Sequence, residues 1–182
     1  LKVVFQNETA PANEEHSFEW LYENGLESYL TSELTDRDLV PGSPFSGHAQ
    51  GNEEEVHWSV QWQQEGEEVV SESYVNLIPT GQGGTHVNGL RTGLLEALRE
   101  FCEFRNLLGR GVKIAPEDIW KRCNYLLSTK MIDPQFSGQT KERLNSRQAF
   151  SFVSAAVKDS FSLWLNQNTE EAEVIAELAI AN

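Results

Sequence analysis

The feature that most restricts this chain is a strict alternation over residues 56–62. The apolar members of the alternation are Val56, Trp58, Val60 and Trp62, and polar side chains stand between them. Successive side chains of a β-strand point to opposite faces, so this period of two predicts a strand with two indoles and two valines on one sheet face. We therefore expect both tryptophans to be shielded from solvent together.

Other segments carry weaker strand signals. Apolar residues predict a strand over residues 1–8, a second short strand is expected over 44–49, and alternation predicts a third over 123–131. Residues 65–67 predict a hairpin turn, after which 69–78 would return as the partner of the 56–62 strand.

Helical periodicity dominates the second half of the sequence. Five helices are predicted: 18–34, capped by Ser17 and containing a tolerated Gly25; a long helix following Thr85 and ending at Gly109 or Gly111; a short one starting at Pro116; and two more over 150–164 and 170–180. This layout, with sheet first and helices later, predicts an α+β domain with a helical C-terminal extension.

The charge is concentrated in the first half. The 182 residues carry a net charge of −14, and residues 1–80 hold two basic against sixteen acidic side chains. This balance argues against a free-standing binder of nucleic acid or of an anionic membrane. No apolar run approaches the roughly 18 residues that a membrane span requires.

Cysteine usage and the start of the chain predict the setting. Cys102 and Cys123 each lie within a predicted regular element, so a disulfide framework is not expected and a reducing cytoplasm is favoured. The chain begins with Leu1 and has no signal-peptide pattern, and we therefore expect it to be a piece of a longer protein.

The sequence contains no motif typical of metal binding or of nucleophilic catalysis. The four histidines and two cysteines are not spaced as metal ligands, and no Gly-x-Ser-x-Gly sequence occurs, so neither a metal site nor a serine nucleophile is predicted. The acidic clusters at 53–55 and 65–68 are interpreted as solvated turns.

Two loops could meet a phosphate. The glycine-rich turn at 81–84 precedes a helix, where backbone amides can bind anions, although a structural strand-to-helix turn is the favoured interpretation. The loop at 134–141 carries Gln139 and Lys141 near a glycine, which suits delivery of a positive charge to a phosphate supplied from elsewhere. An exposed loop with a solvated lysine fits the same residues.

Three segments together resemble the ATPase subunits of type IIA DNA topoisomerases. They are residues 74–91, which contain Gly83-Gly84-Thr85-His86, residues 117–120, and residues 134–141, which contain Gln139-Thr140-Lys141. The amino-acid sequence of residues 74–168 is most similar to the ParE subunits of the topoisomerase IV branch, with the gyrase B branch next. Residues 1–73 match these subunits only loosely.

The resemblance implies a domain organisation. Residues 1–168 would be the transducer domain that follows a nucleotide-binding GHKL domain, and 169–182 would start a helical connection toward the DNA-cleavage core. The implied fold is a small mixed sheet with a left-handed βαβ crossover, helices packed on it, and a long C-terminal helix.

The resemblance also implies a site. Gln139, Thr140 and Lys141 would contact the γ-phosphate of ATP bound, with Mg²⁺, mainly by the preceding domain, and Lys141 would serve catalysis; Arg91 would be a candidate for contact with DNA. A lysine that touches only the terminal phosphate distinguishes ATP from ADP by differential binding, which can shift a conformational equilibrium.

The implied partners are the GHKL domain, a second copy of this chain, the A subunit of topoisomerase IV and double-stranded DNA, with no membrane. The fragment alone is expected to be inactive. Two alternatives stay open: a gyrase B transducer, and a non-catalytic acidic domain that binds a protein partner.

Overall fold

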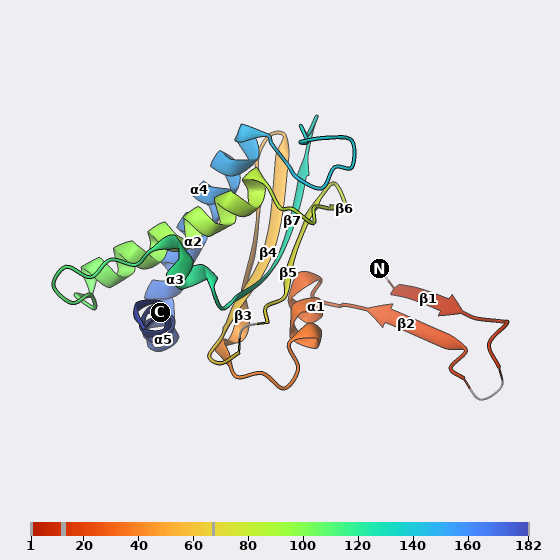
Figure 1. The fold of residues 1–182 in the computed structure, drawn as a ribbon, viewed down its shortest axis with the longest axis horizontal. Coiled ribbons are helices and arrows are strands. Elements are labelled where there is room, and N and C mark those ends of the chain that lie inside the picture. Colours follow the sequence, from red (N-terminus) through yellow and green to blue (C-terminus); the bar gives the residue numbers. More distant parts are fainter. Residues whose placement is uncertain (1, 12–13, 67, 182) are drawn as a thin grey trace.

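The computed structural model describes residues 2–11, 14–66 and 68–181, and it is an α+β structure with two separate sheets (Figure 1). The strands are β1 (Lys2–Gln6), β2 (Ser17–Leu21), β3 (Leu39–Gln50), β4 (Glu54–Gln63), β5 (Ser71–Val75), β6 (Ile78–Pro79) and β7 (Cys123–Met131). The helices are α1 (Leu26–Glu33), α2 (Thr85–Phe104), α3 (Pro116–Trp120), α4 (Arg147–Gln167) and α5 (Thr169–Ile180). Residues 1, 12, 13, 67 and 182 lie outside the described residues, and parts of the predicted strand 1–8, turn 65–67, acidic cluster 65–68 and connection 169–182 fall on them.

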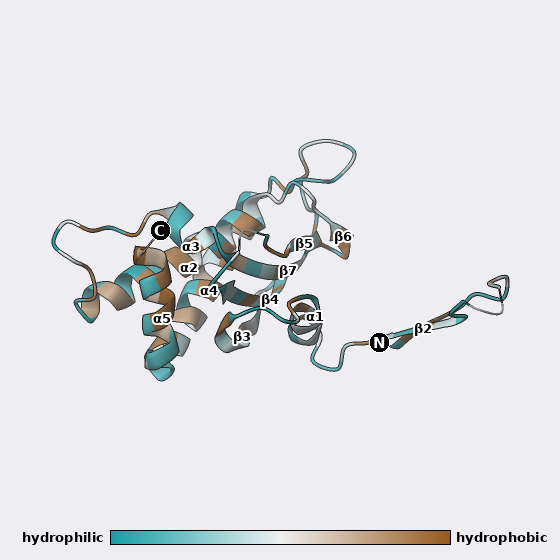
Figure 2. Ribbon diagram, turned by 60° about the horizontal axis from the view of Figure 1, so that its bottom comes forward, coloured by the Kyte–Doolittle hydropathy of each residue, from teal (hydrophilic) through white to brown (hydrophobic). Residues whose placement is uncertain are grey.

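The alternating segment forms the centre of the main sheet. The strand order is β3-β4-β7-β5-β6, and β4 pairs antiparallel with both β3 and β7. Trp58 and Trp62 are each 2% exposed, which confirms the predicted burial of both indoles. Their face packs against apolar residues of α2, α4 and α5, and Figure 2 shows these helices gathered on one side of the sheet while the β1–β2 hairpin reaches away from it.

A parallel βαβ unit joins the two halves of the sequence. Strands β5 and β7 are neighbours in parallel register, with Ser73 opposite Leu127, and the chain between them runs through α2 and α3. The predicted pairing of 69–78 with 56–62 is therefore wrong. Both edges of β4 are already taken by β3 and β7, so the chain that turns after Gln63 cannot return beside β4.

The predicted helix over 18–34 is also wrong in its first part. Phe18 and Trp20 are two residues apart on β2 and therefore point to the same face of that strand. Phe18 lies opposite Phe5 of β1. Helix α1 begins only after Gly25, whose φ of 60° breaks the helical path, so Ser17 lies in a strand and caps no helix. The apolar spacing of this segment fits both a three-to-four-residue and a two-residue period, and pairing with β1 selected the second.

Several boundaries moved, while most of the later elements are confirmed. The strand predicted over 44–49 extends over twelve residues, and α2 ends at Phe104, before either predicted glycine, as Asn106 takes a φ of 55°. The predicted elements at β7, α3, α4 and α5 are present. Helix α5 buries Ala172, Ile175, Ala176 and Ala179 in the main core.

In the described ranges, no helix combines the length and the apolarity needed to cross a bilayer.

Candidate functional site

The loop after β7 is docked by its base onto the glycine-rich turn that starts α2. Three backbone hydrogen bonds join the two segments: Gln82 N to Glu142 O at 2.9 Å, Leu144 N to Gly83 O at 3.0 Å, and Thr85 N to Leu144 O at 3.0 Å. The Gln82 side chain adds a fourth contact, donating from Nε2 to Glu142 Oε2 at 2.8 Å. A segment near residue 83 thus fixes a loop that comes much later in the chain.

Gly84 is required by this docking. A Cβ atom built on Gly84 would lie 2.2 Å from the carbonyl oxygen of Leu144 and 2.5 Å from its nitrogen, both backbone atoms. Its φ of 133° adds a conformation that other residues rarely adopt. The favoured interpretation of the glycine-rich segment, a structural strand-to-helix turn, agrees with this geometry.

The loop is also closed on itself. Ser137 N donates to Arg143 O at 2.9 Å, Asn145 N donates to Gln135 O at 2.7 Å, and Gln135 N donates to Ser146 Oγ at 2.8 Å. Leu144 is 1% exposed and belongs to a small apolar cluster completed by Val75, Met131 and Ala149. The base is therefore a built structure with its own core.

The tip of the loop has none of these restraints. Gln139, Thr140 and Lys141 are all exposed, and the Lys141 ammonium lies 6.0 Å from the ring centroid of Phe136. Among the described residues, the ammonium of Lys141 takes part in no salt bridge. The three predicted residues, which are consecutive in the chain, are thus exposed at the end of a fixed base.

Behind the turn lies a buried polar network that the sequence patterns did not reveal. His86, in the first turn of α2, is fully buried, and its Nε2 lies 3.0 Å from Thr80 Oγ1. Burial lowers the pKa of His86 to about 4, so the imidazole is neutral at neutral pH. The sequence patterns also missed the backbone atoms of Glu142 and Leu144, since main-chain contacts leave no mark on residue type.

Arg91 is held within the domain. Its Nη2 donates to Glu117 Oε1 at 2.9 Å, and its guanidinium lies 5.7 Å from the ring centroid of Trp120. The side chain is 31% exposed. The ion pair and the stacking explain an arginine here without DNA, and a role in DNA contact stays a prediction.

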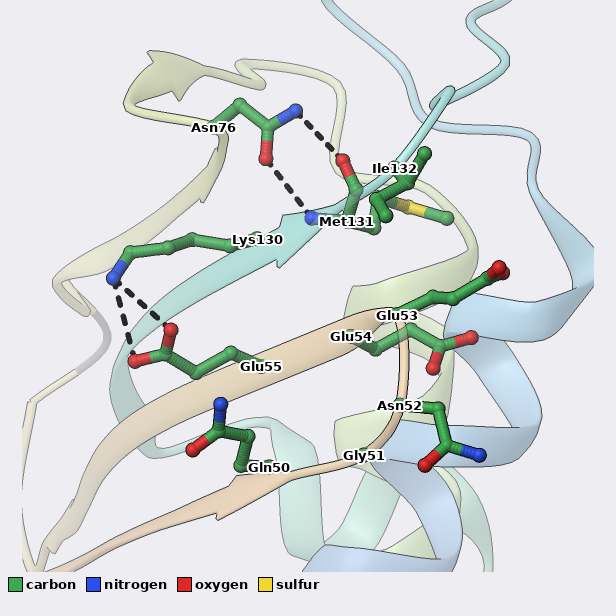
Figure 3. Close-up of a pocket in the computed structure, with 10 residues that line it drawn as sticks. All are labelled: Gln50, Gly51, Asn52, Glu53, Glu54, Glu55, Asn76, Lys130, Met131 and Ile132. Carbon is green, nitrogen blue, oxygen red and sulfur yellow. Dashed lines mark hydrogen bonds and ion pairs between the residues drawn. The ribbon is translucent and has the colours of Figure 1, made fainter.

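The acidic cluster at 53–55 does not place its carboxylates together. Figure 3 shows the Glu55 side chain pointing toward Lys130, whereas those of Glu53 and Glu54 point the other way. Glu55 contacts Lys130 Nζ at 3.1 Å and His57 Nε2 at 2.6 Å, and hydrogen bonds from His57 and Lys130 lower the pKa of its carboxyl group. The interpretation of this cluster as a solvated turn is wrong for Glu54 and Glu55, which both lie on β4, and Glu55 is also ion-paired.

Neither cysteine has the surroundings of a nucleophile. Cys102 and Cys123 are buried free thiols, and burial raises the pKa of both, that of Cys102 to about 11. Within residues 2–11, 14–66 and 68–181, no three His, Cys, Asp or Glu side chains are grouped so that they could hold a metal ion.

Comparison with known proteins gives a consistent result. The family model for DNA gyrase B matches residues 25–182. The B subunit of DNA topoisomerase 4 from Pseudomonas aeruginosa is 59% identical over all 182 residues, and that of Escherichia coli is 60% identical over 163 residues, or 90% of this chain. This chain spans only 28% and 26% of the lengths of these two relatives.

Solved structures agree over the whole chain. The topoisomerase IV ATP-binding domain of Francisella tularensis, solved with a small-molecule inhibitor, matches with a TM-score of 0.83 and 35% identity. The 43K ATPase domain of Thermus thermophilus gyrase B, in complex with an aminocoumarin, matches with a TM-score of 0.85 and 25% identity. All of this chain is covered in both cases, against 47% and 48% of those chains. The family model, the identities and the fold together place this chain in the DNA gyrase B family, among relatives named as the B subunit of DNA topoisomerase 4.

Proposed function

We propose that this chain is the transducer part of the ATPase subunit of a type II DNA topoisomerase, and that its 134–146 loop senses the γ-phosphate of ATP. The observation that carries the proposal is the contrast within that loop: Lys141 is an exposed cation without an ionic partner among the described residues, on a base held by three backbone hydrogen bonds. Such a group can complete a site whose other residues belong to another domain. The Francisella structure is an ATP-binding domain, and this chain covers about half of it, 47%.

The proposed mechanism is a contact that exists only with ATP. Lys141 donates to the γ-phosphate, Gln139 adds an amide hydrogen bond, and Thr140 a hydroxyl. In the complete protein, the preceding GHKL domain binds most of the nucleotide, together with Mg²⁺. When hydrolysis removes the γ-phosphate, the two domains lose this contact and the transducer is free to rotate, which carries nucleotide state toward the DNA gates.

The complete enzyme would be an isomerase that passes one DNA duplex through another, for relaxation and decatenation in the bacterial cytoplasm. Its assembly would contain a second copy of this chain and the A subunit of topoisomerase IV, and Arg91 remains the candidate for DNA contact. Residues 1–168 would form the transducer, and 169–182 would begin the connection toward the cleavage core. The fragment by itself would not turn over ATP.

Gyrase is the second candidate, because the Thermus gyrase B domain has the same fold with a TM-score of 0.85. Sequence identity favours topoisomerase IV, with 59% to the Pseudomonas protein and 25% to the Thermus gyrase structure. Decatenation without negative supercoiling by the enzyme reassembled with its own A subunit would support topoisomerase IV, and negative supercoiling would support gyrase. A non-catalytic domain that binds a protein partner is the third candidate, and the Lys141 experiment separates it from the other two.

The test replaces Lys141 with alanine in the complete protein and measures DNA-stimulated ATP turnover. We expect a fall of about 100-fold or more, which is the usual scale for loss of one donor to a developing charge. Lys121→Ala is the matched control, because Lys121 is also exposed but lies at the end of α3. Turnover in Lys141→Ala equal to that of the control would overturn the proposal.

A further inference from the structure

We propose that His86 is a positioning residue for the γ-phosphate-sensing loop, acting as a neutral hydrogen-bond donor that fixes the turn on which the loop is docked. This inference rests on the function proposed for Lys141. It concerns a buried residue that touches neither nucleotide nor loop tip, and it follows from a count of protons in the network behind the turn.

The count begins with two hydroxyl groups. Three contacts join them: Thr80 Oγ1 lies 2.9 Å from the carbonyl oxygen of Ser73, Ser73 Oγ lies 3.1 Å from the carbonyl oxygen of Thr80, and the two hydroxyl oxygens lie 2.7 Å apart. Each hydroxyl has one proton, so two protons already serve three contacts. The 3.0 Å contact between Thr80 Oγ1 and His86 Nε2 is a fourth, and a proton on the imidazole Nε2 is the arrangement that leaves the fewest of these contacts without a proton.

The tautomer follows from this requirement. His86 carries its proton on Nε2 and leaves Nδ1 as a bare acceptor, and Nδ1 indeed has no hydrogen-bond partner among the described residues. The residue is 0% exposed. A second proton on Nδ1 would create a buried charge without a partner, which is costly, so the neutral form is the one that the fold accommodates.

The position of His86 links this network to the loop. Its imidazole ties the first turn of α2 to Thr80, directly after β6, and the residues between them form the glycine-rich turn. That turn holds Glu142 and Leu144 by backbone hydrogen bonds of 2.9 to 3.0 Å, and Lys141 is the next residue toward the tip. A shift of the turn would therefore carry Lys141 with it, and misplacement by about 1 Å is enough to lose most of the benefit of such a contact.

The experiment compares nucleotide affinities in the complete protein. Dissociation constants for ADP and for a non-hydrolysable ATP analogue are measured by calorimetry for wild type, His86→Leu, His86→Gln and Thr80→Ala. A glutamine amide can donate from nearly the same place as Nε2, whereas leucine cannot donate and Thr80→Ala removes the acceptor. His48→Leu, at an exposed histidine on β3, is the matched control.

We expect the preference for the ATP analogue over ADP to fall about tenfold in His86→Leu and in Thr80→Ala, with ADP affinity nearly unchanged. His86→Gln should keep most of the preference, and His48→Leu all of it. If His86 has only a structural role, the substitutions should weaken the binding of ADP and of the ATP analogue equally, or weaken neither. If His86→Leu does not fold, the comparison of His86→Gln with Thr80→Ala decides, and an equal preference in those two variants would overturn the inference.

Lys141→Ala in the same assay separates the two proposals. If it keeps the preference, the γ-phosphate contact itself is wrong. If Lys141→Ala loses the preference while His86→Leu and Thr80→Ala keep it, only the positioning role of His86 is wrong.

Discussion

The base and the tip of the 134–146 loop are built in opposite ways. The base is held by backbone hydrogen bonds to the glycine-rich turn and surrounds the buried Leu144, whereas Gln139, Thr140 and Lys141 at the tip are exposed. A rigid base with a free tip suits a group whose partner lies on another domain, because little of the binding energy is spent on ordering the loop. The comparison predicts that base substitutions change stability and tip substitutions change activity.

The largest effect on stability is expected for Gly84→Ala, at the base. The new Cβ atom would meet Leu144 backbone atoms at 2.2 and 2.5 Å, so the loop must leave the turn. We expect the free energy of unfolding to fall by about 3 kcal/mol or more, from backbone strain together with lost hydrogen bonds. Urea unfolding followed by tryptophan fluorescence measures this loss.

Gly138→Ala is the control for that prediction. Gly138 near the tip also has a positive φ, 118°, but an added Cβ there meets nothing within 4 Å. Gly138→Ala should therefore lower the free energy of unfolding by only about 1 kcal/mol, from backbone strain. Equal losses in the two variants would mean that the base is no more constrained than the tip.

Leu144→Ala should have the next largest effect. Leu144 is 1% exposed in its cluster, and truncating a buried leucine costs about 2–5 kcal/mol from lost burial and a residual cavity. Ile132, just after β7 and 68% exposed, provides the control, and Ile132→Ala should change stability by less than about 0.5 kcal/mol. Denaturant midpoints for the two variants give the comparison, and a small loss for Leu144→Ala would show that the base lacks a core of its own.

The fold was predictable where one strong period acts alone. Residues 56–62 alternate without competition, and the long helices α2 and α4 carry a single apolar stripe. Prediction failed around Phe18 and Trp20, where the apolar spacing fits both a helix and a strand. It also failed for β5, which pairs with β7, far along the chain, and not with the preceding strand β4. Both failures are cases in which tertiary pairing overrides local preference.

The site was half predictable for a related reason. Gln139, Thr140 and Lys141 are recognisable because a resemblance to known proteins rests on side-chain identity. The contacts of Glu142 and Leu144 with the turn use main-chain atoms, which any residue supplies, and only Gly84 marks them in the sequence. His86 and Thr80 are joined by a hydrogen bond between separate elements, for which no spacing rule exists.

Lowering the pH should loosen the base through His86. Its pKa in the folded state, about 4, lies below the ordinary value of 6.5, so the unfolded chain takes up a proton first as pH falls. The contribution of neutral His86 to the free energy of unfolding is complete above about pH 6.5 and decreases from there toward pH 4. A loss near 2 kcal/mol is expected at about pH 5. Urea unfolding at about pH 7.5 and about pH 5 should show a smaller difference for His86→Gln than for wild type, and an identical difference would contradict the buried neutral histidine.

The smallest effect on stability is expected at the tip, for Lys141→Ala. The side chain is exposed and its one described contact is with the Phe136 ring, at 6.0 Å, a distance at which an exposed cation–π pair contributes about 0.5 kcal/mol. The denaturant midpoint should therefore stay close to that of wild type even though ATP turnover in the complete protein falls. A loss of stability as large as that of Leu144→Ala would mean that the tip is part of the folded core, and a fall in turnover could then no longer be assigned to a missing contact with phosphate.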